Sequence, residues 1–464
     1  MKALSRALRA VTPRKSVFVI AAVVVATPAL AERRLALVVG EGAYPSAPLA
    51  TAANDAGLIA DSLRAAGFEV TGVRDADQGT LRQALRDFTG AASQAGPDAV
   101  TFVYLAGRGL QFEGDNFFAP VDARIQRDLD VPSEALRVSD FSRAFQNIPG
   151  KARFFVLDAA RMNPFPKEGQ PIAGGLAMVE APAQTVIAFN AAPGTVAPEE
   201  KGPYGVYATA LAETLREGGV MADRMFERVR LKVTDMTRGA QVPWHVSTLQ
   251  GSFALLDRAP GAPALPPLPG DRTGSISTPA DAFAVAVRRD TIAAYREFIR
   301  VHPKDPLTGR ARAMLAARRE AAIWRASVDA NKPEAYWTYL RRYPKGPHAA
   351  DARRQLGRLS ARLEPPETYV EYVYEVPPPP VEEYVYWERR PVVVFEEVDA
   401  VPPPRGFYRD ASHDWRPPPP PPPPGPGLLP IPIPIPLAGV SRLPAAVAPP
   451  PDRRRRHRSS RRCG

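Results

Sequence analysis

The sequence predicts an α/β domain, followed by a small all-α repeat region and a disordered proline-rich tail. Over residues 33–258, apolar runs rich in β-forming residues alternate with segments of helical periodicity, which is the pattern of a mainly parallel sheet with helices on both faces. A repeated helical pattern follows within residues 279–360, as expected for stacked helical hairpins. Half of the chain's 54 prolines lie in residues 364–451, and proline disfavours both helix and sheet because it lacks a backbone donor.

Five apolar runs are predicted as strands, and the third is hydrophobic enough to be buried on both faces. The runs are Leu35–Val39, Phe68–Val73, Val100–Leu105, Phe154–Leu157 and Thr185–Phe189. The helical segments are Ala50–Ala66, Thr80–Ala91, Val138–Ile148, Tyr204–Glu217 and Ala222–Thr237. A hairpin is predicted after the third strand, over Phe112–Pro120, with Gly114-Asp115-Asn116 as its turn.

Residues 1–31 are predicted to be a secretory signal peptide. Basic residues precede the apolar run Val17–Ala26, and Ala29-Leu30-Ala31 is a small-x-small cleavage site. The run is short for a membrane span, which takes roughly 20 apolar residues. We therefore expect cleavage between Ala31 and Glu32 and a periplasmic or secreted protein, with an uncleaved anchor as the alternative.

The net charge of +11 arises at the two ends of the chain. The signal segment is basic, and the tail Arg453–Arg462 is rich in arginine and free of acids. The residues between them are close to neutral, which argues against nucleic-acid binding. The tail is expected either to lie on an anionic envelope surface, at ~1 kcal/mol per basic residue, or to stay solvated.

An internal repeat follows a predicted linker over residues 259–278, which is rich in Pro, Gly and Ser. Ala294-Tyr295 and the residues after it recur 41 positions later as Ala335-Tyr336. Each unit reads as a helix, a proline turn and a second helix, and the region 279–360 resembles two tetratricopeptide-like repeats. Because three units are usually needed for stability, we expect them to pack with a short helix near Ala280–Ala286, with the preceding domain or with a partner.

Residues 361–464 are predicted to be a disordered, low-complexity region with polyproline II stretches such as Pro417–Pro424. Two aromatic, β-prone segments interrupt the prolines, Tyr369–Glu375 and Glu382–Trp387. They are either docking strands or coil with scattered aromatic residues.

Two short motifs each follow a predicted strand. Residues 104–109 read YLAGRG and residues 157–164 read LDAARMNP. If these strands are neighbours, both motifs lie at the carboxyl edge of the sheet, where open parallel sheets bind ligands. The motifs resemble the active-site segments of bacterial caspase-like and metacaspase-like cysteine peptidases, which read roughly Y-x-A-G-H-G and D-A-C-R-x-N-P.

Further motifs occur in the order that this family shows. They are Leu37–Gly40 with Ala43-Tyr44, Asn54-Asp55-Ala56, Pro120–Ala123, Ala192-Pro193-Gly194 and Gln241–Trp244. Asn54 or Asp55 would also serve as a helix N-cap. The resemblance covers residues 33–258 and implies a caspase-like fold for them.

The resemblance places the catalytic histidine and cysteine of the family at Arg108 and Ala160. Alanine has no nucleophile, and the guanidinium of Arg108 stays protonated and cannot act as a base. No other thiol in the domain can substitute, because the chain's one cysteine is Cys463, which we expect to be an incidental exposed thiol. His245 is the only histidine of the domain, and it is predicted to be a loop residue.

Asp158 leaves two interpretations open. In metacaspase-like relatives the equivalent acid lines the pocket for a basic residue, so Asp158 is a candidate substrate-pocket residue together with Asp122 and Arg161. Alternatively, Asp158 pairs with Arg108 or Arg161 and closes the crevice, because a buried carboxylate needs a partner. Arg108 would either fill the crevice or bind a carboxylate or phosphate.

We therefore predict an exported, catalytically inactive pseudo-peptidase of this family that acts as a peptide-binding or scaffolding module in the cell envelope. The alternatives are a working cysteine-type endopeptidase, as the family label implies, and a different hydrolase that reuses Asp158 and Asp122. No cofactor is predicted, and no cluster of His, Asp and Glu has the spacing of metal ligands. A peptide or protein partner is expected at the crevice, the helical repeats or the proline-rich segment.

Overall fold

The computed structural model describes residues 32–198, 202–271, 276–380 and 383. Contacts divide the chain into two units, residues 1–418 and 419–464, and all described residues belong to the first. The predicted signal peptide, the run Pro417–Pro424 and the tail Arg453–Arg462 lie outside the described residues. Within the described ranges, no helix combines the length and the apolar character that a membrane crossing needs.

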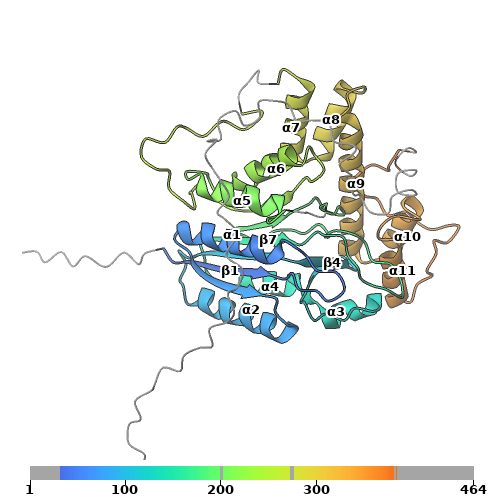
Figure 1. Ribbon diagram of the computed structural model, residues 1–464. Helices are drawn as coiled ribbons and strands as arrows, with labels where there is room; N and C mark the ends of the chain where they lie inside the picture. The colour runs from blue at the N-terminus through green and yellow to red at the C-terminus, as the bar shows by residue number, and fades with distance from the viewer. Residues whose placement is uncertain (1–31, 199–201, 272–275, 381–382, 384–464) are drawn as a thin grey trace, which may run out of the picture. The chain divides into compact units, whose positions relative to one another are not determined.

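A six-stranded sheet forms the centre of the α/β part (Figure 1). Its strand order is β2 (Glu69–Arg74), β1 (Arg34–Gly40), β3 (Val100–Ala106), β7 (Ala152–Asp158), β8 (Thr185–Phe189) and β9 (Trp244–Ser247). Neighbouring strands are parallel except β9, which runs antiparallel to β8. All five predicted strands are confirmed; the short edge strand β9 was not predicted.

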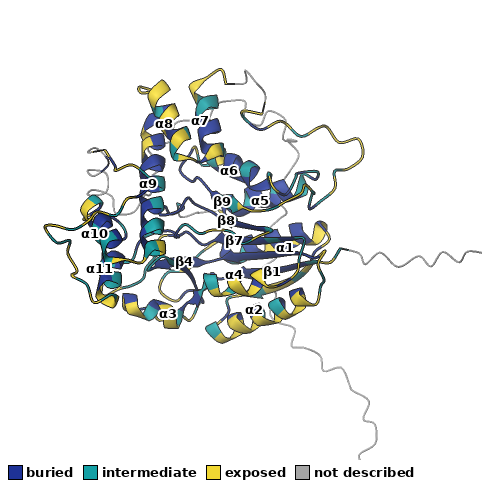
Figure 2. Cartoon of the chain, turned by 180° about the vertical axis from the view of Figure 1, so that it is seen from behind, coloured by how far each residue is buried: buried dark blue, intermediate teal, exposed yellow. Residues whose placement is uncertain are grey.

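Helices cover both faces of this sheet (Figure 1). Alternate strand residues such as Ala36 and Val38 share a core with α1 (Ala52–Ala65), α5 (Val206–Arg216) and α6 (Met225–Met236). The residues between them, such as Leu35 and Leu37, share a core with α2 (Gln78–Ser93) and α4 (Val138–Gln146). The alternation places the buried sides of these helices against the sheet (Figure 2).

A smaller antiparallel sheet follows β3 directly. It consists of β4 (Arg108–Phe112), β5 (Asp115–Ala119) and β6 (Leu136–Arg137), and the 3-10 helix Asp128–Asp130 and α3 (Val131–Glu134) lie between β5 and β6. The predicted turn is wrong by one to two residues, because the hairpin turns at Glu113-Gly114, where φ is 54° and 90°. A two-residue turn with both φ values positive matches the twist of the flanking strands.

Five further helices follow the α/β part: α7 (Pro279–Arg289), α8 (Ile292–Val301), α9 (Thr308–Ala330), α10 (Pro333–Arg342) and α11 (Ala349–Arg358). The pairs α8–α9 and α10–α11 match the two sequence repeats, and α7 matches the predicted short helix. These helices also pack on the α/β part, because Leu231 of α6 and Val242 belong to the same buried cluster as Phe283 and Trp324.

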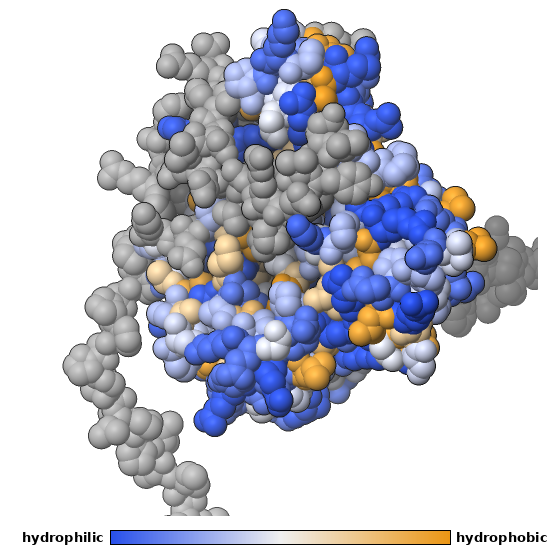
Figure 3. All heavy atoms as spheres, turned by 90° about the vertical axis from the view of Figure 1, so that its right-hand side faces the viewer, coloured by the Kyte–Doolittle hydropathy of each residue, from blue (hydrophilic) through white to orange (hydrophobic). Residues whose placement is uncertain are grey.

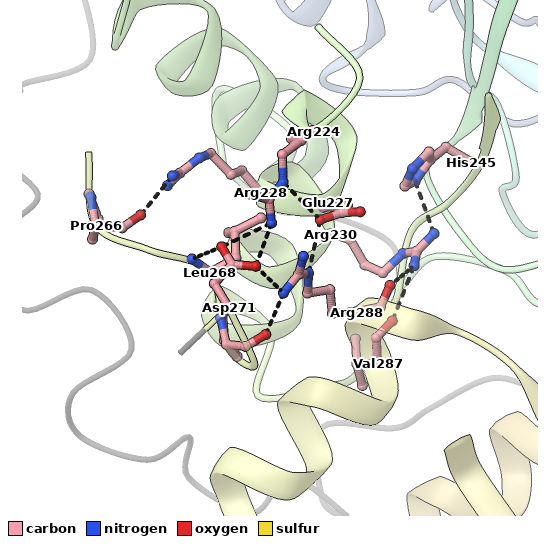
Figure 4. A network of polar contacts seen from close by, with 11 residues as sticks. Arg224, Glu227, Arg228, Arg230, His245, Pro266, Leu268, Asp271, Val287 and Arg288 are labelled. Atoms are coloured by element: carbon pink, nitrogen blue, oxygen red, sulfur yellow. Dashed lines mark hydrogen bonds and ion pairs between the residues drawn. The ribbon is translucent and has the colours of Figure 1, made fainter. Parts of the chain in front are cut away.

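The predicted linker is tied to its neighbours over its described residues. Asp271 accepts hydrogen bonds at 2.7 and 2.9 Å from Arg224, the N-cap of α6, and forms an ion pair with Arg288 of α7 at 2.9 Å (Figure 4). The buried guanidinium of Arg230 donates to the backbone oxygens of Val287 and Arg288 at 3.1 and 2.8 Å. The last turn of α7 is therefore fixed directly to α6.

The start of the predicted disordered region is ordered. Residues 361–380 contain no helix or strand, but Tyr374 is buried and its hydroxyl donates to the backbone oxygen of Ala335 in α10 at 2.7 Å. The segment Tyr369–Glu375 packs on α10 as coil, so its interpretation as a docking strand is wrong. The side of the molecule that carries α10 and α11 is mostly hydrophilic, with hydrophobic residues scattered over it (Figure 3).

Candidate functional site at the ends of β3 and β7

The two sequence motifs lie side by side at the carboxyl edge of the sheet. Strands β3 and β7 are parallel neighbours, and their register pairs Ala106 with Asp158. The backbone nitrogen of Gly109 donates to the oxygen of Ala159 at 2.7 Å. A Cβ at Gly109 would lie only 2.9 Å from that same oxygen, so glycine is needed for this close approach. The two strands are therefore neighbours, which was the condition for the sequence prediction that both motifs lie at this edge.

Ala160 is fully buried in this region. Its backbone nitrogen donates to Oδ1 of Asn190 at 2.9 Å, and its carbonyl oxygen accepts from the backbone nitrogen of Ala197 at 2.8 Å. Asn190 directly follows β8, and its backbone oxygen accepts from Nε2 of Gln241 at 2.9 Å. The loops after β7 and β8 therefore close over the methyl group of Ala160.

Arg108 begins β4, and only 3% of its surface is exposed. Its Nε and Nη2 donate to the backbone oxygen of Ala47 at 3.1 and 2.6 Å, and its Nη1 donates to the oxygen of Met162. The guanidinium lies 5.5 Å from the ring centroid of Tyr44, whose hydroxyl accepts from the Arg108 backbone nitrogen at 3.0 Å. Arg108 thus connects the loop after β1 to the loop after β7.

Asp158 is fully buried at the end of β7. Its Oδ1 accepts from Nη2 of Arg161 at 2.7 Å, and its Oδ2 accepts from the hydroxyl of Tyr104 at 2.7 Å. Burial and the charge of Asp158 raise the pKa of Tyr104 well above its ordinary value, so this hydroxyl keeps its proton and donates. Of the two interpretations of Asp158, the geometry supports the ion pair, and its partner is Arg161.

Asp122 lies in different surroundings from Asp158. Its side chain is exposed, and its Oδ1 accepts from the backbone nitrogen of Gln78, the first residue of α2, at 3.0 Å. The carboxylate therefore satisfies a free donor at a helix start. Asp122 therefore acts as a capping residue for α2, and it is not part of the ion pair between Asp158 and Arg161.

Two predictions about polar residues are wrong. Asn54 and Asp55 lie in the first turn of α1, whose N-cap is Thr51, and the buried Asp55 accepts from the backbone nitrogen of Gly205 at 2.6 Å. His245 is in strand β9 and not in a loop. Asp55 and His245 both hold distant segments together, a role that local sequence patterns do not show.

His245 is poorly suited to proton transfer. Its Nδ1 lies 3.0 Å from Nη2 of Arg230 (Figure 4), and arginine can only donate, so Nδ1 is the acceptor. Burial and the nearby charges of Arg230 and Arg318 hold the pKa of His245 well below its usual range. The imidazole is therefore neutral at pH 7.

Glu41 and Asn190 are site residues that sequence reasoning missed. Both directly follow strands of the parallel sheet, β1 and β8, and that position was the available signal. Glu41 is fully buried, and burial raises its pKa to about 8. Its Oε1 accepts from the backbone nitrogen of Ala76 at 3.2 Å, and its Cβ lies near Gly107. The described residues contain no group of three or more His, Cys, Asp and Glu that could hold a metal ion.

The fold and the site together define an α/β domain of caspase-like architecture. Residues 33–254 match the family model of the caspase domain. This part of the chain is therefore a caspase-like domain.

The solved structures include a similar chain, the crystal structure of caspase-1 from Spodoptera frugiperda. It shares 16% identity with a TM-score of 0.37, and the match covers 50% of this chain and 92% of that chain. No curated protein matches the chain.

Proposed function

We propose that this chain is an exported, catalytically inactive caspase-like protein whose domain is a scaffold for the helical repeats. One observation carries the proposal: side chains that bond to one another or to the backbone fill the region where β3 and β7 end. Arg108, Ala160 and Asp158 are 3%, 0% and 0% exposed. The domain also lacks any cysteine, so no thiolate is available to attack a peptide bond.

The contacts between the α/β part and the repeats support a scaffold role over peptide binding in the crevice. Nε2 of His348, the N-cap of α11, lies 2.8 Å from Oε1 of Gln111 in β4, and Asp351 of α11 accepts from the backbone nitrogen of Glu113 at 3.0 Å. Strand β4 begins with Arg108. The segment that resembles a catalytic loop therefore continues into a strand that positions α11.

Peptide cleavage is the first test. The purified chain, incubated with a library of fluorogenic peptides carrying Arg, Lys or Asp before the scissile bond, is expected to give no turnover above a buffer blank. The variant Cys463→Ser, which removes the one thiol of the chain, is the control. Cleavage that co-elutes with the protein on gel filtration would support the endopeptidase alternative or, if Cys463→Ser retains it, a hydrolase of another class.

Peptide binding is a separate test. Fluorescence anisotropy with labelled peptides that contain arginine or lysine is expected to show no saturable binding, because Asp158 is already paired with Arg161. Saturable binding that Asp158→Asn removes would instead support a peptide-binding crevice.

Export rests on residues 1–31 of the sequence and has its own test. The intact mass of the protein recovered from its own cells is expected to correspond to a chain that starts at Glu32. A mass that includes the first 31 residues, in protein from the membrane fraction, would favour the uncleaved anchor.

A further inference from the structure

The outer face of α10 is covered by an aromatic segment of the chain. The ring of Tyr369 packs edge-on against Trp337 at 5.6 Å between centroids, and the guanidinium of Arg341 lies 4.4 Å from the Tyr369 ring. The backbone nitrogen of Tyr372 donates to Oγ1 of Thr338 at 2.9 Å. Stacking on Arg341, this backbone hydrogen bond and an ion pair of Arg341 with Glu371 at 2.7 Å thus hold the coil segment on this helix.

The 41-residue repeat gives this face a counterpart on α8. Trp337, Thr338 and Arg341 correspond in the repeat to Arg296, Glu297 and Arg300. The same three residues of α8 line an open groove of about 500 Å³, together with Ala293, Ile299 and Leu315.

Two pairs of equivalent positions on the two helices differ in exposure, whereas Arg300 and Arg341 are both exposed. Thr338 is fully buried and Leu340 is 2% exposed, whereas Glu297 is exposed and Ile299 is half-buried. Val301 is 49% exposed. Glu297 and Arg300 form an ion pair with each other at the surface, and an exposed pair costs little to rearrange. The aromatic segment therefore packs on this face of α10. No described residue covers the groove at the equivalent face of α8.

The covering segment leads from α10 toward this groove. Arg342 of α10 donates to the oxygen of Val376 at 3.4 Å, and the buried Glu383 forms an ion pair with Arg319 of α9. Arg319 follows Leu315 by four residues and lies on the same side of α9. The partner of the last described residue therefore lies one helical turn along α9 from Leu315, a residue that lines the groove.

We propose that the groove on α8 binds residues 384–387 of this chain, whose sequence is Tyr-Val-Tyr-Trp and which lie outside the described residues. The guanidinium groups of Arg296 and Arg300 stack on the tyrosine rings as that of Arg341 stacks on Tyr369. Ile299 and Leu315 supply apolar surface for the valine and the tryptophan. Four extended residues reach about 13 Å, which exceeds the rise of one helical turn, about 5.4 Å.

Photo-crosslinking in the full chain tests the proposal. A benzoylphenylalanine at position 386 is expected to crosslink to peptides from 292–301, and the same group at position 369 is expected to crosslink to α10. Crosslinks from position 386 to other segments only, or none where position 369 reacts, would overturn the proposal. Mixing isotope-labelled and unlabelled chains identifies the source, and crosslinks found only between two copies would overturn binding within one chain.

Hydrogen exchange gives a second measurement without a crosslinker. The variant Tyr384→Ser/Tyr386→Ser/Trp387→Ser is expected to exchange roughly five-fold faster in α8, as loss of one stacked cation–π contact implies. Exchange in α10 is the internal control and is expected to stay unchanged. Equal exchange in α8 of the variant and the parent chain would contradict the proposal.

Discussion

At the residue scale, burial at the site has its largest effect on the ion pair between Asp158 and Arg161. Both side chains are nearly or fully buried, at 0% and 6% exposure, and Nη2 lies 2.7 Å from Oδ1. We expect Arg161→Ala to lower the free energy of unfolding by about 3–5 kcal/mol, because it leaves a buried carboxylate without its cation. Urea denaturation measures this change.

A matched control exists on α4. Arg143 and Asp140 form an ion pair at the same i,i+3 spacing, but both side chains are 62% exposed. Arg143→Ala is expected to cost less than about 1 kcal/mol. Equal effects of the two substitutions would show that Asp158 is solvated in solution.

Glu41 predicts a pH dependence. Burial is the main cause of its pKa of about 8, and the charges of Asp75 and Asp122 add to it. Between the ordinary carboxyl pKa near 4.5 and this value, the folded protein holds a proton that the unfolded chain has released, so stability falls as pH rises through this range. Glu41→Gln is expected to remove roughly 2–4 kcal/mol of that fall between pH 5 and 9.

Thermal melts across this pH range measure the slope. The control is Glu69→Gln, because Glu69 is 74% exposed and its neutralisation changes no buried group. A parallel pH dependence in Glu41→Gln and the parent protein would show that the Glu41 carboxyl is hydrated.

The limit of sequence reasoning is clear at this scale. The adjacency of Arg108 and Ala160 could be predicted, because parallel strands end at the same edge of a sheet. The sequence could not identify the partner of Asp158, because Arg108 and Arg161 were both predicted to lie close to it. Side-chain direction decided the question: Arg108 reaches the backbone of Ala47 and Met162, and Arg161 reaches the carboxylate.

At the element scale, a buried polar network joins β4 to α11. Nδ1 of His348 lies 2.7 Å from Oε1 of Glu320, and its Nε2 lies 2.8 Å from Oε1 of Gln111. Nε2 of Gln111 donates to the oxygen of Gly174, which fixes its Oε1 as an acceptor. Nε2 of His348 is therefore the donor toward Gln111, and the imidazole stacks on Trp324 at 4.7 Å between centroids.

Removal of this imidazole is expected to loosen the hairpin. His348→Ala leaves Oε1 of Gln111 without this donor and leaves Glu320 with the hydroxyl of Tyr339 but not the imidazole, so we expect a loss of about 2–4 kcal/mol of unfolding free energy. Hydrogen exchange in β4 and β5 is expected to rise more than in β1 or β3. A change confined to α11 would contradict a network that supports the hairpin.

Elements differ in how well sequence predicts them. The bounds of the buried strands and the long helices were predicted to within a few residues, because the spacing of apolar residues along the sequence indicates them. The turn at Glu113-Gly114 was shifted, because Asp115 and Asn116 are equally common turn residues. The coil over residues 361–380 was taken as disordered, since its order depends on contacts with α10 that local composition does not show.

At the scale of the whole molecule, the α/β part and the repeats share one buried cluster and the network of Arg230 (Figure 4). Two helical repeats are too few to be stable alone, so their stability depends on this interface. We expect one calorimetric unfolding transition for the described parts. Two separated transitions would indicate independent domains.

The variant Arg230→Met tests the interface in the same experiment. It removes donors to Pro243, Val287 and Arg288 and is expected to lower the melting temperature of the single transition by several degrees. Arg288→Met, which removes less buried ion pairs with Glu227 and Asp271, is the matched control and is expected to have a smaller effect.

The side chain of Arg108 also bears on how readily this region could be rebuilt around a histidine and a cysteine. A histidine at this position would be too short to serve both Ala47 and Met162, and a carbonyl left without a donor away from water costs about 1–3 kcal/mol. The double substitution Arg108→His and Ala160→Cys would therefore first lower stability and gain nothing until the loops after β1 and β7 also changed. The residue at this one position thus sets the order in which changes can accumulate, with the two loops first and the pair of side chains second.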